Sequence, residues 1–355
     1  METINGYTIL TPFTQVGGGQ CEWAQAEKGG AKYFIKRFLR PTYSDLGSPE
    51  TKALRKKRCE EFEQHHRDMS HRLKAVSAGD GNLVTTKDFF RENSHYFKTT
   101  EWIDIGPDTL ETIQHLPNMD KFTIALTTVH CVQGLHQAGI VHGDLKPNNI
   151  LIMKTPLSYA ARLIDFDDSY VTGEPPAELV GTLDYYSPEV FLYIKGKCSG
   201  SDLTTRADIF SLGIILCEYF TGRKPRIIDD GSHPDTIADA VIQGFMLETG
   251  LSGGMDDLVH RMLQRDPNDR PTCLKVIEDL KKLKSGTSLH PEPPLPTTKT
   301  SGVTITMTMR KPTSDPLRTP SSRPGATITG TTGVRGPFDD PAIEISGTLM
   351  RRRAA

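Results

Sequence analysis

The sequence lacks paired cysteines. Its six cysteines are scattered along the chain, and none belongs to a C-x-x-C pair. Metal sites and the disulfide frameworks of small secreted domains need clustered or paired spacings. We therefore expect a reduced protein, located in the cytoplasm.

Long apolar runs and an excess of positive charge are also missing. The most apolar stretch, 209–220, is too short to span a bilayer and contains Ser211 and Glu218. Residues 1–19 have neither the basic start nor the apolar centre of a signal peptide. The formal net charge is −2, so the basic excess typical of nucleic-acid-binding proteins is absent. We expect no membrane span and no nucleic-acid partner.

The amino-terminal part predicts a small lobe rich in strands. Residues 7–38 are strand-like, and they are interrupted by glycines at 17–19 and by a hairpin-like turn at Lys28-Gly29-Gly30. A charged helical pattern covers 48–76. Two further strands are expected at 83–92 and 94–103.

The next part predicts a mainly helical lobe. Apolar residues recur at helical spacing over 120–137. Further helices are expected at 207–220, 255–263 and 272–283. We therefore expect an α+β fold with a β-rich lobe over 1–103 and a helical lobe over 104–285.

The composition changes after about residue 284. Thr, Ser, Pro, Gly and Arg dominate 286–355, and Phe338 is its one aromatic residue. Such a segment cannot bury enough apolar surface to offset its ordering entropy, so we expect it to be disordered. Residues 303–309 alternate like a strand that could pair with a sheet edge.

The tail also offers candidate phosphorylation sites. Several threonines stand near basic residues or prolines: Thr298, Thr313, Thr319, Thr329 and Thr348. Phosphorylation would add charge that a phosphothreonine-reading partner can recognise. A plain solubilising tail is the equal alternative.

The strongest chemical signal is the stretch 142–149, which reads HGDLKPNN. Phosphoryl transfer needs an acceptor for the hydroxyl proton, a cation near the moving phosphate and a ligand for a metal ion. An Asp, a Lys two residues on and an Asn five residues on meet these needs. The stretch resembles the catalytic loop of protein kinases, H-R-D-L-K-P-x-N. By that resemblance Asp144 is the catalytic base, Lys146 steadies the γ-phosphate and Asn149 binds Mg²⁺.

A second signal is the stretch 163–167, which reads LIDFD. An Asp at the end of an apolar run can bind the Mg²⁺ that bridges nucleotide phosphates. The stretch resembles the kinase D-F-G segment, so Asp165 becomes the other metal ligand. Asp167 stands where the family has Gly, and the backbone should therefore flip less freely.

The stretch 33–36, YFIK, resembles the kinase motif V-A-I-K. Lys36 would contact the α- and β-phosphates of ATP, and Phe34 stands where the family has a small Ala against adenine. An ordinary Lys on an exposed strand is the alternative. We expect Lys36 to pair with an acid of the following helix. The candidates are Glu60, Glu61 and Glu63, of which we favour Glu63.

Two looser stretches resemble the rest of a kinase nucleotide site. Residues 16–24, VGGGQCEWA, resemble the glycine-rich loop, in which glycines let backbone N–H groups approach phosphates. Residues 97–103, FKTTEWI, resemble the strand that leads into the hinge. The alternatives are a flexible turn and an ordinary strand. The implied ATP-binding residues are Val16, Gly17, Gly18, Gly19 and Ala24, the backbone near Glu101 and Ile103, and Thr100 as gatekeeper.

The H-G-D triplet also occurs in small-molecule kinases of the aminoglycoside and choline kinase-like folds, so the acceptor class depends on later motifs. Residues 181–189, GTLDYYSPE, resemble the segment that ends in A-P-E and seats a peptide. Asp208 resembles the Asp that braces the catalytic loop, and Arg270 resembles the Arg that pairs with the A-P-E glutamate, here Glu189. Small-molecule kinases lack this set. Thr182 and the following DYY favour Ser or Thr as acceptor.

Gly143 suggests how the enzyme is regulated. In many kinases an Arg at this position pairs with a phosphorylated activation loop. Since no Arg is present, we expect activity without phosphorylation of the early loop hydroxyls, Ser169 and Thr172.

The resemblance covers about residues 7–283 and implies a cytoplasmic signalling enzyme. We expect an ATP- and Mg²⁺-dependent Ser/Thr protein kinase that phosphorylates protein substrates and itself. Three departures from the family motifs motivate the alternative of a pseudokinase that acts as a nucleotide-gated binding module: Glu22, Phe34 and Asp167. A small-molecule phosphotransferase is the third reading. The presence of Lys36 and of the Asp144, Asn149 and Asp165 set favours the active kinase.

Overall fold

A computed structural model describes most of the first 289 residues. It covers 1–15, 21–77, 81–104, 110–156, 158–228, 231 and 234–289. The described residues all belong to one compact unit. Nearly all of the tail at 286–355, including the strand-like stretch 303–309 and the five candidate threonines, lies outside the described residues.

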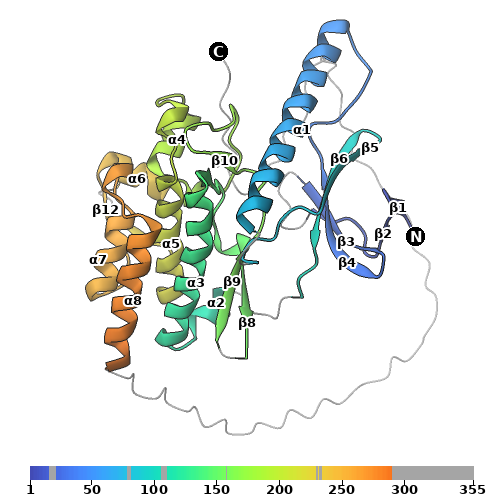
Figure 1. The fold of residues 1–355 in the computed structure, drawn as a ribbon. Helices are drawn as coiled ribbons and strands as arrows, with labels where there is room; N and C mark the ends of the chain where they lie inside the picture. The colour runs from blue at the N-terminus through green and yellow to red at the C-terminus, as the bar shows by residue number, and fades with distance from the viewer. Residues whose placement is uncertain are drawn as a thin grey trace, which may run out of the picture. The chain divides into compact units, whose positions relative to one another are not determined.

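The amino-terminal lobe consists of a six-stranded antiparallel sheet and one long helix, α1 (Pro49–Ser77) (Figure 1). The strand order is β1-β2-β3-β4-β6-β5. The strands are β1 (Thr3–Ile4), β2 (Tyr7–Ile9), β3 (Cys21–Lys28), β4 (Ala31–Phe38), β5 (Asp88–Glu92) and β6 (His95–Glu101). The expected β-rich lobe with a helix over 48–76 is thus present.

The turn between β3 and β4 is the predicted hairpin. Lys28 pairs with Ala31, and the two residues between them, Gly29 and Gly30, have φ angles of 60° and 79°. Two positive φ values in a two-residue loop match the twist of paired strands, and glycine adopts them without steric cost. The register of the whole β3–β4 pair follows from this turn.

Alternation along the strands separates the two faces of the sheet. One face carries a core cluster that includes Ala24, Ile35 and Phe97, packed with residues of β1 and β2. The opposite face carries Phe38 and Tyr96, which pack with Cys59 and Phe62 of α1. Side chains in register with Phe38 along β4, such as Lys36, therefore share the face that α1 covers.

The strand expected over 83–92 is shorter than the sequence pattern indicated. Strand β5 begins at Asp88, whereas Leu83 forms a parallel bridge with Leu163 of the other lobe. The amide of Val84 donates to the carbonyl of Leu163 at 2.9 Å. The apolar residues before β5 thus belong to the connection between the lobes.

The second lobe is mainly helical, as expected. Its helices are α2 (Leu110–Gln114), α3 (Asn118–Gln137), α4 (Pro188–Ile194), α5 (Arg206–Thr221), α6 (Ile237–Gln243), α7 (Gly253–Met262) and α8 (Cys273–Leu289). Figure 1 shows α3, α5 and α8 running alongside one another, and residues of all three share one core cluster. Helix α5 is buried at every residue from Ala207 to Tyr219, because a helix that is apolar on all sides needs neighbours all round. Helix α8 extends past the expected end at residue 283.

Three short antiparallel strand pairs complete this lobe. They are β7 (Ile140–Val141) with β10 (Tyr170–Val171), β8 (Ile150–Lys154) with β9 (Tyr159–Leu163), and β11 (Arg226–Ile228) with β12 (Met246–Glu248). The β8–β9 hairpin pairs Ile150 with Leu163, and the amide of Ile164 donates to the carbonyl of Asn149 at 3.0 Å. Two motifs that are distant in the sequence, ending at Asn149 and beginning at Asp165, are thereby brought side by side.

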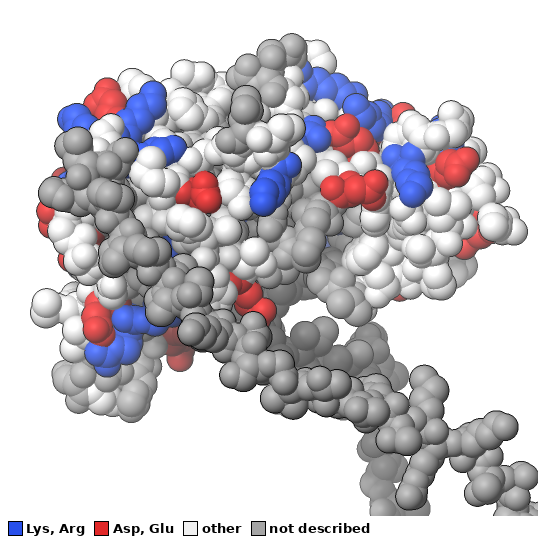
Figure 2. Space-filling model, turned by 90° about the horizontal axis from the view of Figure 1, so that it is seen from below, with Lys and Arg blue, Asp and Glu red and all other residues white. Residues whose placement is uncertain are grey.

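The surface shown in Figure 2 carries charges of both signs. Lys and Arg side chains lie scattered between Asp and Glu side chains on the described part of this face. Among the described helices, none is long and apolar enough to cross a membrane.

Candidate active site

Asp208, at the start of α5, holds the loop 142–149 by hydrogen bonds. Its carboxylate accepts hydrogen bonds from the amides of His142 at 2.8 Å and Gly143 at 3.2 Å, and it lies 2.9 Å from Nε2 of His136. Asp208 is almost fully buried. A buried carboxylate with several donors is satisfied and rigid, so the loop is fixed to the helical core where the sequence analysis placed a bracing Asp.

Asp144 lies at the centre of the loop's hydrogen bonds. Its Oδ2 accepts from Lys146 Nζ at 2.6 Å and from Asn149 Nδ2 at 3.0 Å. Its Oδ1 accepts from the backbone amide of Thr182 at 2.9 Å. Lys146 also donates to the Thr182 hydroxyl at 2.7 Å. The structure therefore brings Asp144, Lys146, Asn149 and the 181–189 segment together.

The backbone conformation and surroundings of Gly143 leave no room for a side chain. Its φ angle is 82°, and a Cβ atom there would lie 2.3 Å from the carbonyl oxygen of Asp168. A side chain at this position would displace the backbone after Asp167. The glycine of the H-G-D triplet therefore allows the close approach of Asp168, the residue that follows the D-F-D segment.

Asn149 and Asp165 supply the candidate metal ligands. Asp165 has a φ of 61°, an uncommon left-handed conformation for a residue with a side chain. It follows directly on the Ile164–Asn149 hydrogen bond, so both side chains come from one short stretch of paired backbone. A carboxylate and an amide oxygen fit Mg²⁺, which prefers hard oxygen ligands and completes its shell with substrate phosphates and water. Among the described residues no group of three or more His, Cys, Asp or Glu is arranged to hold a metal.

Lys36 is held by two carboxylates of the LIDFD segment. Its Nζ lies 2.7 Å from Asp165 Oδ1 and 2.7 Å from Asp167 Oδ2. Asp167 also accepts a hydrogen bond from Lys98 of β6, which stands directly opposite Lys36 in the sheet. Burial alone would lower the pKa of Lys36, but the carboxylates of Asp167 and Asp165 raise it well above its usual value.

Two adjacent carboxyl groups in this segment have opposite pKa shifts. Burial opposes ionisation of Asp167, yet Lys36 and Lys98 hold its pKa well below the usual range. Asp168 is desolvated as well and lies near the carboxylates of Asp144, Asp165 and Asp167, which raise its pKa well above that range. The difference arises because the two lysines contact Asp167 and not its neighbour.

The expected pair between Lys36 and Glu63 is not formed, and this prediction is corrected. Glu63 accepts a hydrogen bond from the Tyr96 hydroxyl at 2.8 Å and lies 3.9 Å from Arg67. The other two candidate acids form exposed ion pairs within α1, Glu60 with Lys56 and Glu61 with Lys57. The α1 residue that approaches this cluster is His66, whose Nδ1 lies 3.8 Å from Asp167 Oδ1. The helix thus presents an imidazole where a carboxylate was expected.

Ala24 is also placed differently from the expectation. It pairs with Ile35, is fully buried and belongs to the core on the far face of the sheet from Lys36. Directly paired residues share a face, so Trp23, which pairs with Lys36, lies on the lysine side. Trp23 stacks on Phe34, with ring centroids 5.3 Å apart and planes 22° apart. Trp23, stacked on Phe34, thus lies on this face where Ala24 was expected.

The remaining nucleotide-site residues are only partly defined. Val16, Gly17, Gly18 and Gly19 lie outside the described residues. Thr100 pairs with Phe34 across β4 and β6 and so faces the same side. The Glu101 carboxylate is bonded to Arg162 of β9, and Ile103 is partly buried after the end of β6.

The segment expected to seat a peptide is anchored at its end. Arg270 donates two hydrogen bonds to the Glu189 carboxylate, at 2.7 and 2.8 Å, and the Arg270 side chain is fully buried. Further donors of the same guanidinium reach the carbonyls of Gln264, Arg265 and Arg206. The two residues that the sequence analysis paired are therefore in contact, with their charges satisfied.

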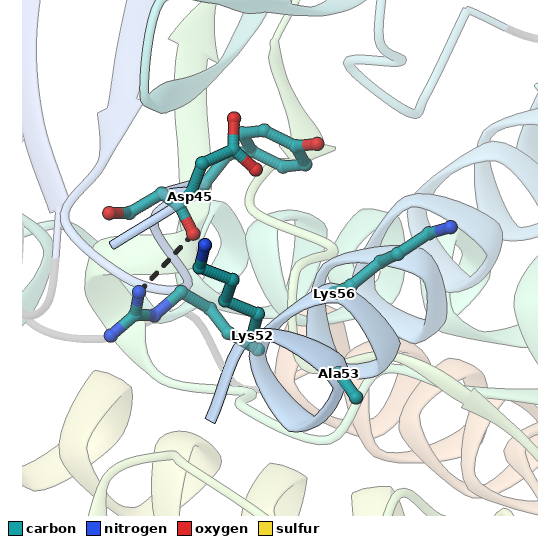
Figure 3. A pocket seen from close by; sticks show the side chains of 7 residues that line it. Asp45, Lys52, Ala53 and Lys56 are labelled. Carbon is teal, nitrogen blue, oxygen red and sulfur yellow. Dashed lines mark hydrogen bonds between the residues drawn. The ribbon is translucent and has the colours of Figure 1, made fainter. Parts of the chain in front are cut away.

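A small hollow of about 120 Å³ lies apart from these residues (Figure 3). It is formed by the segment Tyr43, Ser44 and Asp45 and by the first turns of α1, with Lys52, Ala53, Arg55 and Lys56. Arg55 closes one side by donating to the carbonyl of Ser44 at 3.2 Å, and Lys56 points away from the segment. None of the predicted site residues lines it.

Sequence reasoning missed Lys98, His66 and Trp23. Lys98 is two residues before Thr100, so strand alternation places both on one face, but only the β4–β6 register shows that this face is that of Lys36. Trp23 is placed by the β3–β4 register in the same way. His66 had no local signal, because its role depends on how α1 packs.

Comparison with known proteins identifies the family. The family profile described as the protein kinase domain matches residues 51–280, more than half of the chain. The chain belongs to the protein kinase family. The structure resembles that of the Cydia pomonella granulovirus kinase, with a TM-score of 0.52 at 18% identity, covering 77% of this chain and 92% of that one. At this identity the likeness concerns the fold.

Several curated relatives of the chain carry kinase names. Mitogen-activated protein kinase kinase kinase 8 of Rattus norvegicus is 34% identical over 49% of this chain and 37% of that protein. A calcium and calcium/calmodulin-dependent serine/threonine-protein kinase of Medicago truncatula is 31% identical over 56% of this chain and 38% of that protein. The serine/threonine-protein kinase PknB of Mycobacterium leprae is 30% identical over 50% of this chain and 28% of that protein. The chain thus spans well under half the length of these relatives.

Proposed function

We propose that this chain is an active, ATP- and Mg²⁺-dependent Ser/Thr protein kinase. The observation that supports this most strongly is the hydrogen bonding of Asp144. Lys146, Asn149 and the amide of Thr182 all donate to its carboxylate. A positioned acceptor, a cation and a metal ligand around one point are what phosphoryl transfer requires.

Each of these residues has one task in the proposed reaction. The Asp144 carboxylate accepts the proton of the substrate hydroxyl as its oxygen bonds to the γ-phosphorus, and the bond from that phosphorus to the ADP oxygen breaks. Lys146 carries positive charge next to Asp144, where the phosphoryl group passes. Lys36 contacts the α- and β-phosphates. Asn149 and Asp165 hold Mg²⁺, which neutralises phosphate charge when bound with ATP.

Protein acceptors are favoured over small molecules by the anchored segment that follows. The amide and hydroxyl of Thr182 contact Asp144 and Lys146, and the end of the segment is tied to Arg270 through Glu189. A segment fixed at both ends beside the catalytic loop offers an ordered backbone against which a peptide can lie. We extend the proposal to autophosphorylation of threonines in the tail that follows α8, which we propose to be disordered.

The decisive experiment is phosphate transfer from labelled ATP with Mg²⁺. The chain itself and a generic basic protein are the acceptors, and Asp144→Asn is compared with the wild type. We expect the variant to lose about 10²- to 10⁴-fold in rate, the usual contribution of a positioned general base. Digestion and mass spectrometry would then locate the labelled residues, including any in the tail.

The possible outcomes separate the active protein kinase from the binding module. Label on Ser or Thr that disappears in Asp144→Asn supports the protein kinase. If the wild type transfers no phosphate to protein although ATP stabilises its fold, a nucleotide-gated binding module replaces this proposal. Such a module would use Lys36, bound to Asp165 and Asp167, and the Trp23–Phe34 stack.

A further inference from the structure

Asp167 is the carboxylate that joins the two lysines of the site. Its Oδ2 accepts from Lys36 of β4 at 2.7 Å, and its Oδ1 accepts from Lys98 of β6. Its side chain is 14% exposed, and the side chains of Lys36 and Lys98 are 10% and 9% exposed. Both oxygens of one buried carboxylate are therefore used to hold cations from neighbouring strands.

Helix α1 supplies no carboxylate to these lysines among its described residues. Two glutamates in this part of the helix contact other residues: Glu63 accepts a hydrogen bond from Tyr96, and Glu61 pairs with Lys57. What α1 contributes is His66, buried between the rings of Phe62 and Phe89 and 3.8 Å from Asp167. Helix α1 therefore contacts the site through the packed side chain of His66 and not through an ion pair with Lys36.

The charges of the cluster require Lys98 and Asp167 together. A buried lysine or carboxylate without a partner costs several kcal/mol. Without Lys98, the carboxylates of Asp165 and Asp167 would share the single cation of Lys36. Without Asp167, two lysines that stand opposite each other in register would be left with Asp165. The two residues are complementary additions to one site.

Asp165 cannot serve as the lasting partner of Lys36 in the proposed reaction, because it is the proposed metal ligand. A carboxylate oxygen that faces a divalent cation is a weaker partner for an ammonium group. Asp167 has no such second task, and its contact with Lys36 is equally short. It can therefore keep Lys36 in place in every state of the site.

We propose that Asp167 is the positioning residue for Lys36, aiming its ammonium group at the nucleotide phosphates, and that Lys98 balances its charge. This inference rests on the proposed function for its phosphate ligand. The orientation of Lys36 is then coupled to the segment after Asp165, and not to a carboxylate of the long helix.

The test compares Asp167→Asn with Glu63→Gln, which removes the acid that sequence reasoning favoured. Glu61→Gln, an exposed acid of the same helix, is the matched control. Affinity for Mg²⁺-ADP is measured by calorimetry, and KM for ATP, KM for a protein acceptor and kcat are measured by transfer. We expect Asp167→Asn to weaken Mg²⁺-ADP binding and to lower kcat/KM for ATP by about 10- to 100-fold, the usual effect of losing a partner that orients a ligand-binding group.

The pattern across the parameters distinguishes positioning from general damage. KM for the protein acceptor should stay within about twofold in Asp167→Asn, and both helix variants should stay within about twofold in every parameter. The double variant Asp167→Asn with Lys98→Met should lose less than the sum of the two single variants, because the partners are removed together. This double variant, which leaves no unpaired lysine on β6, also provides the answer if Asp167→Asn alone does not fold.

The inference is overturned if Glu63→Gln weakens nucleotide binding while Asp167→Asn leaves it near the wild-type value. It is also overturned if the losses from Asp167→Asn and Lys98→Met simply add. Binding of Mg²⁺-ADP decides this even if the wild type transfers no phosphate, so failure of the proposed function is recognised separately, by a wild type that is as inactive as Asp144→Asn.

Discussion

At the scale of single residues, the buried pair Arg270–Glu189 shows how one contact can carry much of a segment's stability. The guanidinium is fully enclosed, and its hydrogen bonds go to carbonyl and carboxylate oxygens. Such a pair adds little compared with an apolar replacement of the same shape, but removing one partner leaves a buried charge.

We predict that Glu189→Gln lowers the free energy of unfolding by about 3 to 5 kcal/mol, because the Arg270 charge stays buried without its counterion. Urea unfolding followed by circular dichroism measures this change. Glu278→Gln, which removes an exposed partner of Lys275, is the control and should leave the unfolding curve unchanged. Equal effects of the two substitutions would contradict the prediction.

At the scale of one element, the segment 165–189 is held in place without any phosphate. The Ser169 hydroxyl donates to the carbonyl of His142 at 2.9 Å and is fully buried. The Thr172 hydroxyl is buried without a hydrogen-bond partner among the described residues. Neither hydroxyl is presented to a kinase, and Gly143 offers no side chain to a phosphate. The contacts of Thr182 and Glu189 order the segment instead.

We therefore predict that Ser169→Ala combined with Thr172→Ala keeps most of the wild-type transfer rate. The serine variant gives up one hydrogen bond, worth about 1 kcal/mol of stability. Transfer to a protein acceptor and the mass of the purified active chain are measured together. Thr182→Val is the contrasting variant and should slow transfer, because Lys146 loses its hydroxyl acceptor.

A folded but inactive alanine double variant would show that these hydroxyls act in catalysis or regulation. Stoichiometric phosphate on Ser169 or Thr172 in the active protein would contradict the prediction equally. Either result would mean that the segment leaves the arrangement described above during activation.

At the scale of the whole described unit, His136 links three helices of the larger lobe. It belongs to α3, its Nε2 lies 2.9 Å from Asp208 of α5, and its Nδ1 lies 3.3 Å from the sulfur of Cys273 in α8. Burial alone would lower the pKa of His136, but its contacts with Cys273 and Asp208 raise it to about 9. The folded protein therefore favours the protonated imidazole.

This link predicts a stability that falls on the alkaline side. A folded-state pKa above the unfolded value of about 6.5 adds stability that is complete below that value and is lost as the pH rises through about 9. We expect the wild type to lose on the order of 1 to 3 kcal/mol relative to His136→Gln over this range. Urea unfolding at several pH values measures the difference between the two proteins.

The control is His71→Gln, which changes an exposed histidine of α1. The difference in unfolding free energy between this variant and the wild type should be the same at every pH. If the difference between the wild type and His136→Gln did not vary with pH, His136 would not be charged in the folded protein at neutral pH.

Much of the architecture could be predicted from local patterns. Helices α1, α3, α5 and α7 lie close to their expected ranges because apolar spacing and capping are short-range features. The β3–β4 turn was predicted because only glycine accepts two successive positive φ values easily. The prediction of a strand from residue 83 was wrong in its first part, because Leu83 pairs with the other lobe and not within the sheet.

The amino-acid sequence by itself determined the motifs from which the catalytic residues are proposed, since a dense motif such as HGDLKPNN fixes residue types and spacing at once. Only the tertiary structure decided which charges meet. The strand register placed Lys98 beside Lys36, moved Ala24 to the far face and set Trp23 on the near one. Packing of α1 placed His66 near Asp167 and Glu63 against Tyr96. The reason is that strand register and helix packing set these contacts. Partners such as Lys36 and Lys98, which lie 62 positions apart along the chain, leave no local pattern that pairs them.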